Sequence, residues 1–275
     1  MKNKLAKVTA NKIIEGVKRI NLNLTGKTVL TEAASNEYMV TCILAAYAGA
    51  KVYAYGKDSR HGLFDDIVTD IKSVIGELDR FIDIEFIKEL SPIYINQAHI
   101  ITNSGHLRPL NMNILMHAKK DVVIPLMYES WEFRDDDVDL KTIKELGIRL
   151  GGTNERHSDV DVFNYLGDMC FKLILDSGSS LYNNKFVLLC NNDFGPYIAQ
   201  SLSKHCELLV IDLDTNKSKY DGLDITWQGG FPCAVIPTEF NYAEAVIFTA
   251  YPFTEPWIGR DKSPIKIQEL VKTLK

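Results

Sequence analysis

The 275-residue chain lacks the features that mark several classes of protein. No stretch approaches the roughly 18–20 consecutive apolar residues of a membrane-spanning helix, so we expect no membrane partner. The basic N-terminus, with Lys2, Lys4 and Lys7, lacks the continuous apolar core of a signal peptide. A net charge of −5 argues against nucleic-acid partners, because phosphate binding relies on clustered lysine and arginine.

Cysteine is scarce, and the five cysteines are scattered without Cys-x-x-Cys spacing. Their odd number and spacing argue against a disulfide framework and against a zinc site of the usual kind. No combination of His and Asp at ligand spacing occurs elsewhere, so we expect no metal. Reduced thiols of this kind predict a cytoplasmic protein.

Glycine is missing from the turn where a nucleotide would need it most. An apolar strand at 186–189 leads into a turn, and a second strand at 208–211 ends on an acid. In the pattern G-x-G-x-x-G, the first two glycines allow a tight turn and close approach to a pyrophosphate, and the third lets helix and strand pack. The corresponding residues are Cys190, Asn192 and Gly195. The segment therefore predicts a nucleotide-binding fold in which the glycine for packing is present and the two glycines that approach the nucleotide are absent.

The acid after the second strand favours NAD over NADP. Asp212 follows Cys190 by about 20 residues, the spacing at which an acid accepts hydrogen bonds from the ribose hydroxyls and disfavours a 2′-phosphate. The Cβ atoms of Cys190 and Asn192 would crowd the pyrophosphate, which leaves a second interpretation open. In that interpretation the fold is kept as a scaffold or as the surface of a homodimer. The candidate cofactor residues are Cys190, Asn192, Asp193, Phe194, Gly195 and Asp212.

Short apolar runs alternate with helical patterns in the first half of the chain, which predicts an α/β domain with a doubly wound parallel sheet over 1–157. Ser35 is expected to cap the first helix after a strand, and Gly49 to end it. Further helices are expected at 63–75, 110–119 and 139–146. The strand candidates are 27–31, 52–55, 81–86, 100–102, 122–127 and 148–150.

A longer helix that opens at Ser158 is expected to connect the domains over 158–180. A second, shorter series over 181–275 predicts another doubly wound, parallel domain that binds NAD(P). Its strand candidates are 186–189, 208–211, 234–236 and 245–249, with a helix near 264–273. Because a full dinucleotide domain has about six strands, either this domain is reduced or the chain is a fragment.

Polar side chains follow the strands of the first domain. Ligands bind outside the carboxyl ends of parallel strands, so these loops are expected to share one edge and to face the second domain across a cleft. Arginine can pair with a carboxylate or phosphate, and histidine beside a carboxylate can move a proton. Each residue alone also has a simpler explanation, as a helix cap or a solvated loop residue. The candidate catalytic residues are Arg60, His61, His106, Arg108, Glu129, Glu132, Arg134, Asn154 and Glu155.

Three segments resemble the two-domain, NAD(P)-binding Rossmann architecture of D-2-hydroxyacid dehydrogenases and formate dehydrogenases. They are Val138-Asp-Leu-Lys-Thr-Ile-Lys-Glu-Leu-Gly-Ile-Arg-Leu-Gly-Gly-Thr-Asn154, the helix 159–176 that leads to Asn184-Lys-Phe-Val-Leu-Leu189, and Ala245-Val-Ile-Phe-Thr-Ala-Tyr-Pro252. The likeness runs in order over residues 95–270. It implies that Tyr251 and Pro252 lie over the nicotinamide side of a cofactor. No residue matches the family's catalytic Arg, Glu and His, so its chemistry does not transfer residue by residue.

Three functions are compatible with these patterns. The first is an NAD-linked oxidoreductase of a small anionic metabolite resembling a 2-hydroxy or 2-oxo acid, with the substrate in the interdomain cleft. The second is a degenerate, non-catalytic paralogue that binds a metabolite or a partner chain. The third is a lyase or hydrolase that uses the His, Glu and Arg residues of the first domain without a nucleotide.

Overall fold

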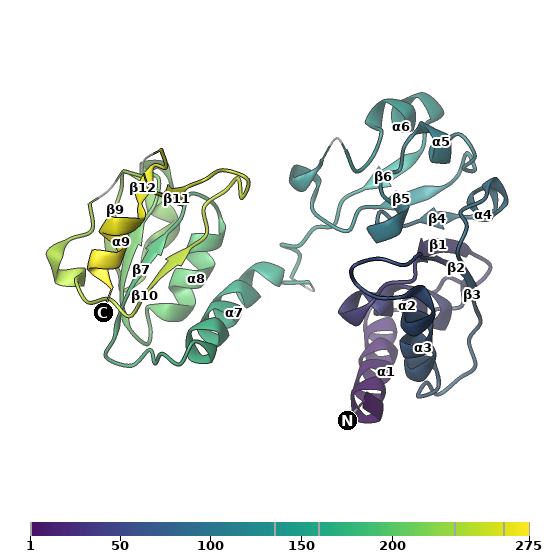
Figure 1. Ribbon diagram of the computed structural model, residues 1–275, viewed down its shortest axis with the longest axis horizontal. Helices are drawn as coiled ribbons and strands as arrows, with labels where there is room; N and C mark the ends of the chain where they lie inside the picture. Colours follow the sequence, from purple (N-terminus) through teal and green to yellow (C-terminus); the bar gives the residue numbers. More distant parts are fainter. Residues whose placement is uncertain (1, 135, 159, 234, 261, 275) are drawn as a thin grey trace. The chain divides into compact units, whose positions relative to one another are not determined.

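The computed structural model describes residues 2–134, 136–158, 160–233, 235–260 and 262–274. The chain divides into two compact units, residues 1–154 and 155–275 (Figure 1). Each unit is built on a parallel sheet with helices, which confirms the predicted α/β class with two parallel-sheet units. No helix in the described part of the chain is both long and apolar enough to cross a membrane.

The first unit has a six-stranded sheet in the order β3-β2-β1-β4-β5-β6, with every pair parallel. This is the strand order of a doubly wound dinucleotide-type fold. Its elements are α1 (Lys2–Arg19), β1 (Thr28–Glu32), η1 (Asn36–Met39), α2 (Val40–Tyr47), β2 (Lys51–Tyr55), α3 (Phe64–Ile75), β3 (Ile84–Ile87), α4 (Pro92–Gln97), β4 (Ile100–Ile101), η2 (Gly105–Leu107), α5 (Met112–Leu115), β5 (Val123–Pro125), η3 (Ser130–Glu132), α6 (Leu140–Leu146) and β6 (Arg149–Gly151).

Both faces of the first sheet are buried. Neighbouring residues of a strand point to opposite faces, and here they join different hydrophobic clusters. Val29 and Val52 pack in the cluster formed with α1, α2 and α3, whereas Leu30 and Tyr53 pack in the cluster on the other face. Covered faces explain why apolar residues such as Val29 and Leu30 follow one another in these strands without strict polar alternation.

Helix α1 is absent from the sequence-based expectation. Ala6, Ala10, Ile13 and Val17 recur at helical spacing and are buried against α2 and α3. All four are small or β-branched and stand among lysines, so the apolar stripe is weak in the sequence. The predicted cap at Ser35 is also wrong, because Ser35 precedes the 3₁₀ turn η1 and its side chain makes no capping hydrogen bond.

The second unit has a four-stranded parallel sheet in the order β10-β7-β8-β9 and a small parallel pair of β11 and β12. The order corresponds to one mononucleotide-binding half of a dinucleotide domain plus its neighbouring strand. Its elements are α7 (Val162–Asp176), β7 (Lys185–Leu189), α8 (Phe194–Leu202), β8 (Glu207–Ile211), η4 (Asp214–Tyr220), β9 (Thr226–Gln228), η5 (Thr238–Phe240), β10 (Ala245–Phe248), β11 (Ile258–Gly259), β12 (Ile265–Lys266) and α9 (Ile267–Thr273).

Two boundaries in this unit differ from the prediction. Helix α7 begins at Val162 and not at Ser158, because Asp161 before it has a left-handed backbone with φ 50°. The predicted strand at 234–236 is wrong at residues 235 and 236, which lie outside any strand, while Ala234 lies outside the described residues. The strand of this region is β9, whose polar ends Thr226 and Gln228 hide it in the sequence.

Helix α7 packs on α8 within the second unit, although the sequence suggests a connecting helix. The Phe163 ring lies 5.5 Å from that of Phe194 and 5.4 Å from that of Tyr197, measured between centroids. Gly167 faces Ser201 so closely that a Cβ at Gly167 would lie 1.9 Å from the serine Oγ. The two helices therefore form one layer over the four-stranded sheet of the second unit.

Candidate functional site

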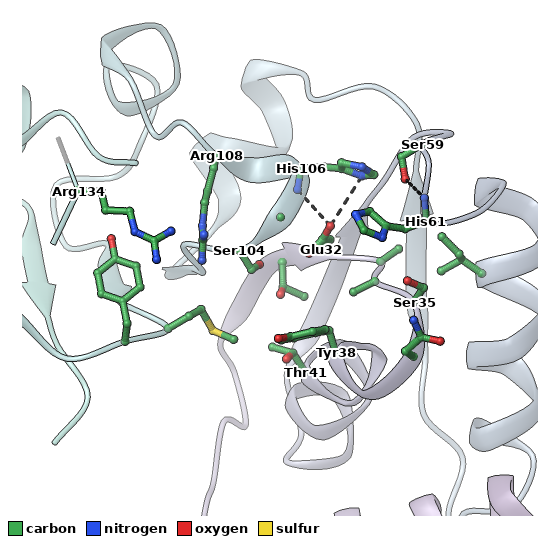
Figure 2. Close-up of a pocket in the computed structure, with 18 of the residues that line it drawn as sticks. Glu32, Ser35, Tyr38, Thr41, Ser59, His61, Ser104, His106, Arg108 and Arg134 are labelled. Atoms are coloured by element: carbon green, nitrogen blue, oxygen red, sulfur yellow. Dashed lines mark hydrogen bonds and ion pairs between the residues drawn. The ribbon is translucent and has the colours of Figure 1, made fainter. Parts of the chain in front are cut away.

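A pocket of about 480 Å³ lies in the first unit, at the carboxyl ends of its central strands (Figure 2). Five of the predicted catalytic residues line it, namely His61, His106, Arg108, Glu132 and Arg134. Four others do not line it: Arg60, Glu129, Asn154 and Glu155. Within the described residues no group of three or more His, Cys, Asp or Glu is placed to hold a metal ion.

Glu32, the last residue of β1, lies in the pocket against the first turn of η2. A Cβ built on Gly105 would lie only 1.8 Å from Glu32 Oε1, so the carboxylate rests directly on the glycine backbone. The backbone N–H of His106 donates a hydrogen bond to Oε1 at 3.1 Å. The Glu32 side chain keeps 16% of its surface exposed. Glu32 is not among the predicted residues, although its position at the end of the first strand is a signal that the sequence contains.

The His106 ring has a defined tautomer. Its Nδ1 accepts a hydrogen bond from Lys57 N at 3.2 Å, so a neutral ring carries its proton on Nε2. Nδ1 also lies 3.8 Å from Glu32 Oε1, and because it is an acceptor here this contact is not a hydrogen bond. The neutral ring therefore has a donor at Nε2 and an acceptor at Nδ1.

A chain of three buried hydroxyl groups lies next to Glu32. Thr102 Oγ1 donates to Thr31 Oγ1 at 2.8 Å and is also 2.8 Å from Ser104 Oγ. A hydroxyl group has one hydrogen, so Thr102 accepts the second bond and Ser104 donates it. Ser104, which lines the pocket, consequently presents only lone pairs to a ligand.

Arg108 and Arg134 lie on one side of Ser104 in Figure 2, and Glu32, His106 and His61 lie on the other. Arg108 uses Nε and Nη2 to donate to Asn103 O at 3.2 and 3.0 Å, and its Nη1 lies 3.9 Å from Asp137 Oδ2. The Arg134 guanidinium lies 6.0 Å from the centre of the Tyr128 ring and, in the described part of the chain, pairs with no carboxylate. Arg108 is thus largely held by the protein, and Arg134 is available to an anion.

The remaining predicted residues have other positions. Arg60 is exposed, and its Nε donates to His61 Nε2 at 3.2 Å, so it holds the ring of a pocket residue. Glu129 is only 7% exposed and precedes η3. Asn154 and Glu155 stand at the division between the two units.

The turn at 190–195 in the second unit is filled by its own side chains. Asn192 Oδ1 accepts from Phe194 N at 3.0 Å, and Cys190 Sγ lies 3.4 Å from Asn192 N. The Asn192 amide also donates to Thr249 O, and Asn191 exchanges two hydrogen bonds of 2.7 Å with the backbone of Tyr251. Two backbone N–H groups of the turn, those of Asn192 and Phe194, therefore already have acceptors.

Asp193, at the start of α8, is held by two cations. Lys219 Nζ lies 2.6 Å from Oδ1, and Arg156 Nη2 lies 2.9 Å from Oδ2. The hydrogen bond from Lys219 is the largest cause of a lowered pKa of the Asp193 carboxyl, and Arg156 adds to it. The protein thus places a carboxylate at the N-cap position of α8, although this side chain makes no hydrogen bond to the N–H groups of the helix.

Asp212 is completely buried. Leu213 N and Asn216 Nδ2 donate to Oδ1 at 2.6 and 2.9 Å, and the Tyr220 hydroxyl donates to Oδ2 at 2.7 Å. In this conformation no surface of Asp212 is open to a ribose, and its role in ribose binding stays a prediction. Gly195 contacts the same network, because a Cβ there would lie 2.2 Å from the Tyr220 hydroxyl oxygen.

The Asp212 carboxyl is expected to make folding stability depend on pH. Burial raises its pKa above the ordinary value of 3.8 in spite of three hydrogen bonds. Its contribution is therefore fully present below pH 3.8 and is lost as the pH rises through the folded pKa. The Asp212→Asn variant should lack this loss, so its free energy of unfolding relative to the wild type should increase with pH. Urea unfolding at a series of pH values measures the difference, and a flat difference would contradict it.

These contacts do not fit a pyrophosphate on the turn in the conformation described. Gly195 fits the packing role of the third glycine, but Asn192 and Cys190 occupy the place of the bound group. Binding would require the Asn192 side chain to leave Phe194 N.

No protein-family model and no curated protein matches the chain. Solved structures do match it. A dipicolinate synthase polypeptide from Bacillus halodurans matches with a TM-score of 0.53 and 13% identity, over 82% of this chain and 75% of that one. A dipicolinate synthase polypeptide from Bacillus subtilis matches with a TM-score of 0.53 and 12% identity, over 83% and 74%. An NAD-dependent formate dehydrogenase from Staphylococcus aureus matches with a TM-score of 0.39 and 12% identity, over 81% of this chain and 64% of that one.

Identities at this level show the fold alone. The fold is that of two-domain Rossmann proteins, which confirms the architecture that the sequence resemblance predicts.

Proposed function

We propose that the chain is an NAD-linked oxidoreductase of a small anionic metabolite, and that the metabolite binds in the pocket of the first unit. The observation that carries the proposal is the pocket, where an available arginine, Arg134, accompanies Glu32 and His106. A volume of about 480 Å³ suits a small metabolite. The nicotinamide part is supported by the Rossmann strand order of both units.

The chain's own residues supply binding and proton transfer. Arg134 offers a planar fork of N–H donors to a carboxylate or phosphate. His106, with its proton on Nε2, and the Glu32 carboxylate are placed to give or take one proton at the bound molecule.

A second candidate is favoured by the filled turn in the second unit. Phe194 N and Asn192 N already have acceptors, and the Asp193 carboxylate lies at the start of α8. A lyase, a hydrolase or a binding protein would need only the pocket of the first unit. The two candidates differ in whether a nucleotide binds.

Thermal shift and calorimetry with NAD, NADH, NADP and adenosine test the difference. We expect NADH to stabilise the wild type, because a ligand of the native state raises its stability. The Asn192→Gly variant should bind NADH about tenfold more tightly, because it frees the backbone N–H of Phe194 for the pyrophosphate. One additional hydrogen bond of about 1.4 kcal/mol corresponds to that factor.

Asn191→Gly is the matched control, because the Asn191 amide pairs with Tyr251 and leaves Phe194 N untouched. Its nucleotide affinity should stay at the wild-type level. If no nucleotide stabilises the wild type or Asn192→Gly at millimolar concentration, the oxidoreductase is ruled out and the second candidate stands.

A further inference from the structure

The two ends of the pocket have opposite character. Glu32 offers a carboxylate at one end, Arg134 offers a cation at the other, and Ser104 lies between them with a hydrogen-bond acceptor. We infer that the ligand is a zwitterion of the amino-acid type, with its ammonium group at Glu32 and Ser104 and its carboxylate at Arg134. The inference rests on the proposed function: it keeps the carboxylate of the proposed metabolite and adds an ammonium group that offsets the negative charge.

Glu32 is a partly satisfied charge. A carboxylate has about four acceptor positions, and the donor that the structure gives Glu32 is the N–H of His106. In the described part of the chain no lysine or arginine lies within ion-pair distance of it, and the nearest ring nitrogen, His106 Nδ1, is itself an acceptor. A charge with little exposure is costly unless it is paired, so a donor-bearing cation completes this end.

Ser104 limits which chemical group of the ligand can bind beside it. Its hydrogen is used in the buried chain to Thr102, so its oxygen accepts from the ligand and cannot donate to it. An ammonium group has three donors and a positive charge, which match both Ser104 and Glu32.

Other carboxylic acids fit this end less well. A 2-oxo group would direct its oxygen at Glu32 and Ser104, which are both acceptors. A second carboxylate would place a like charge beside Glu32. A hydroxyl group offers one hydrogen and no charge, so a 2-hydroxy acid should rank between the amino acid and the 2-oxo acid.

Arg134 provides the opposite end. It has no carboxylate partner in the described residues, whereas Arg108 directs Nε and Nη2 to Asn103 O. A ligand carboxylate therefore finds one free guanidinium on the side of the pocket away from Glu32.

Calorimetric titration without nucleotide tests the inference. The common amino acids are screened by thermal shift, and the strongest is compared with its own 2-hydroxy and 2-oxo analogues. We expect the amino acid to bind at least about tenfold more tightly than the 2-oxo acid, as is typical of a charge-assisted pair.

Three variants separate the two ends. Glu32→Gln should abolish the preference for the amino acid, and Ser104→Ala should reduce it several-fold, whereas Arg134→Gln should weaken all the carboxylates alike. Glu37→Gln, an exposed carboxylate outside the pocket, is the control and should leave binding unchanged. Circular dichroism establishes that each variant is folded.

Two results would overturn the inference. One is a 2-oxo or 2-hydroxy acid that binds as tightly as the amino acid, or a preference that survives both Glu32→Gln and Ser104→Ala. The other is no binding of any amino acid at millimolar concentration. If the 2-oxo acid still binds and depends on Arg134, the pocket of the proposed function remains and only the zwitterion is excluded.

Discussion

The Gly105→Ala substitution is expected to abolish the preference of the first-unit pocket for an amino acid over its 2-oxo analogue, while the protein stays folded. The new Cβ would lie 1.8 Å from Glu32 Oε1, at a position with φ +36°. The carboxylate would have to leave its place beside His106 N, so the pocket would lose its acceptor end. The backbone strain adds a cost of about 1–3 kcal/mol to folding.

Binding is measured by calorimetry, and folding by urea unfolding. Gly26→Ala is the matched control, because Gly26 has φ +74° and no atom lies within 4 Å of a Cβ built on it. It should lower stability through backbone strain and leave binding intact. If Gly105→Ala binds the amino acid with wild-type affinity, binding does not depend on the contact between the Glu32 carboxylate and the Gly105 backbone.

The Gly195→Ala substitution is expected to destabilise the second unit by about 2–5 kcal/mol, from overpacking and a lost hydrogen bond. The new Cβ would lie 2.2 Å from the Tyr220 hydroxyl oxygen and 2.7 Å from Cys190 Sγ. Both neighbours are buried, and Tyr220 donates to the buried carboxylate of Asp212. A displaced Tyr220 leaves that carboxylate short of one donor.

Urea unfolding followed by tryptophan fluorescence measures the loss, since the Trp227 ring lies 5.1 Å from that of Tyr220. Gly16→Ala is the control, because Gly16 is also helical and has nothing within 4 Å of a Cβ. Alanine is the better helix former by about 1 kcal/mol, so the control should gain stability. Equal unfolding midpoints for Gly195→Ala and the wild type would contradict the packing role of Gly195.

The sheets could be predicted because buried parallel strands are continuous apolar runs. β1, β2, β7 and β8 all lie within a residue or two of their expected positions. Elements without a continuous apolar run were missed or misplaced. The buried side of α1 consists of small or β-branched residues among lysines, and β9 has polar residues at both ends.

The sequence could predict where the site lies, but only some of the residues that form it. Topology gathers the carboxyl ends of parallel strands, which is how the sequence led to His106, Arg108 and Arg134. It does not tell which way a side chain points. The burial of Asp212 and the hydrogen bonds of Arg108 within the protein depend on packing that residue spacing does not encode.

The position of β7 in its sheet bears on how the second unit is made. β7 pairs with β8 on one side and with β10 on the other. During synthesis on the ribosome, β8 emerges soon after β7, whereas β10, which begins at Ala245, emerges much later. Until then one edge of β7 has no partner strand. Val187 and Leu189, whose neighbours in the sheet are Val246 and Phe248, then remain uncovered along that edge. A nascent chain halted between β8 and β10 is the species that a chaperone has to shield, because an open apolar strand edge recruits other chains.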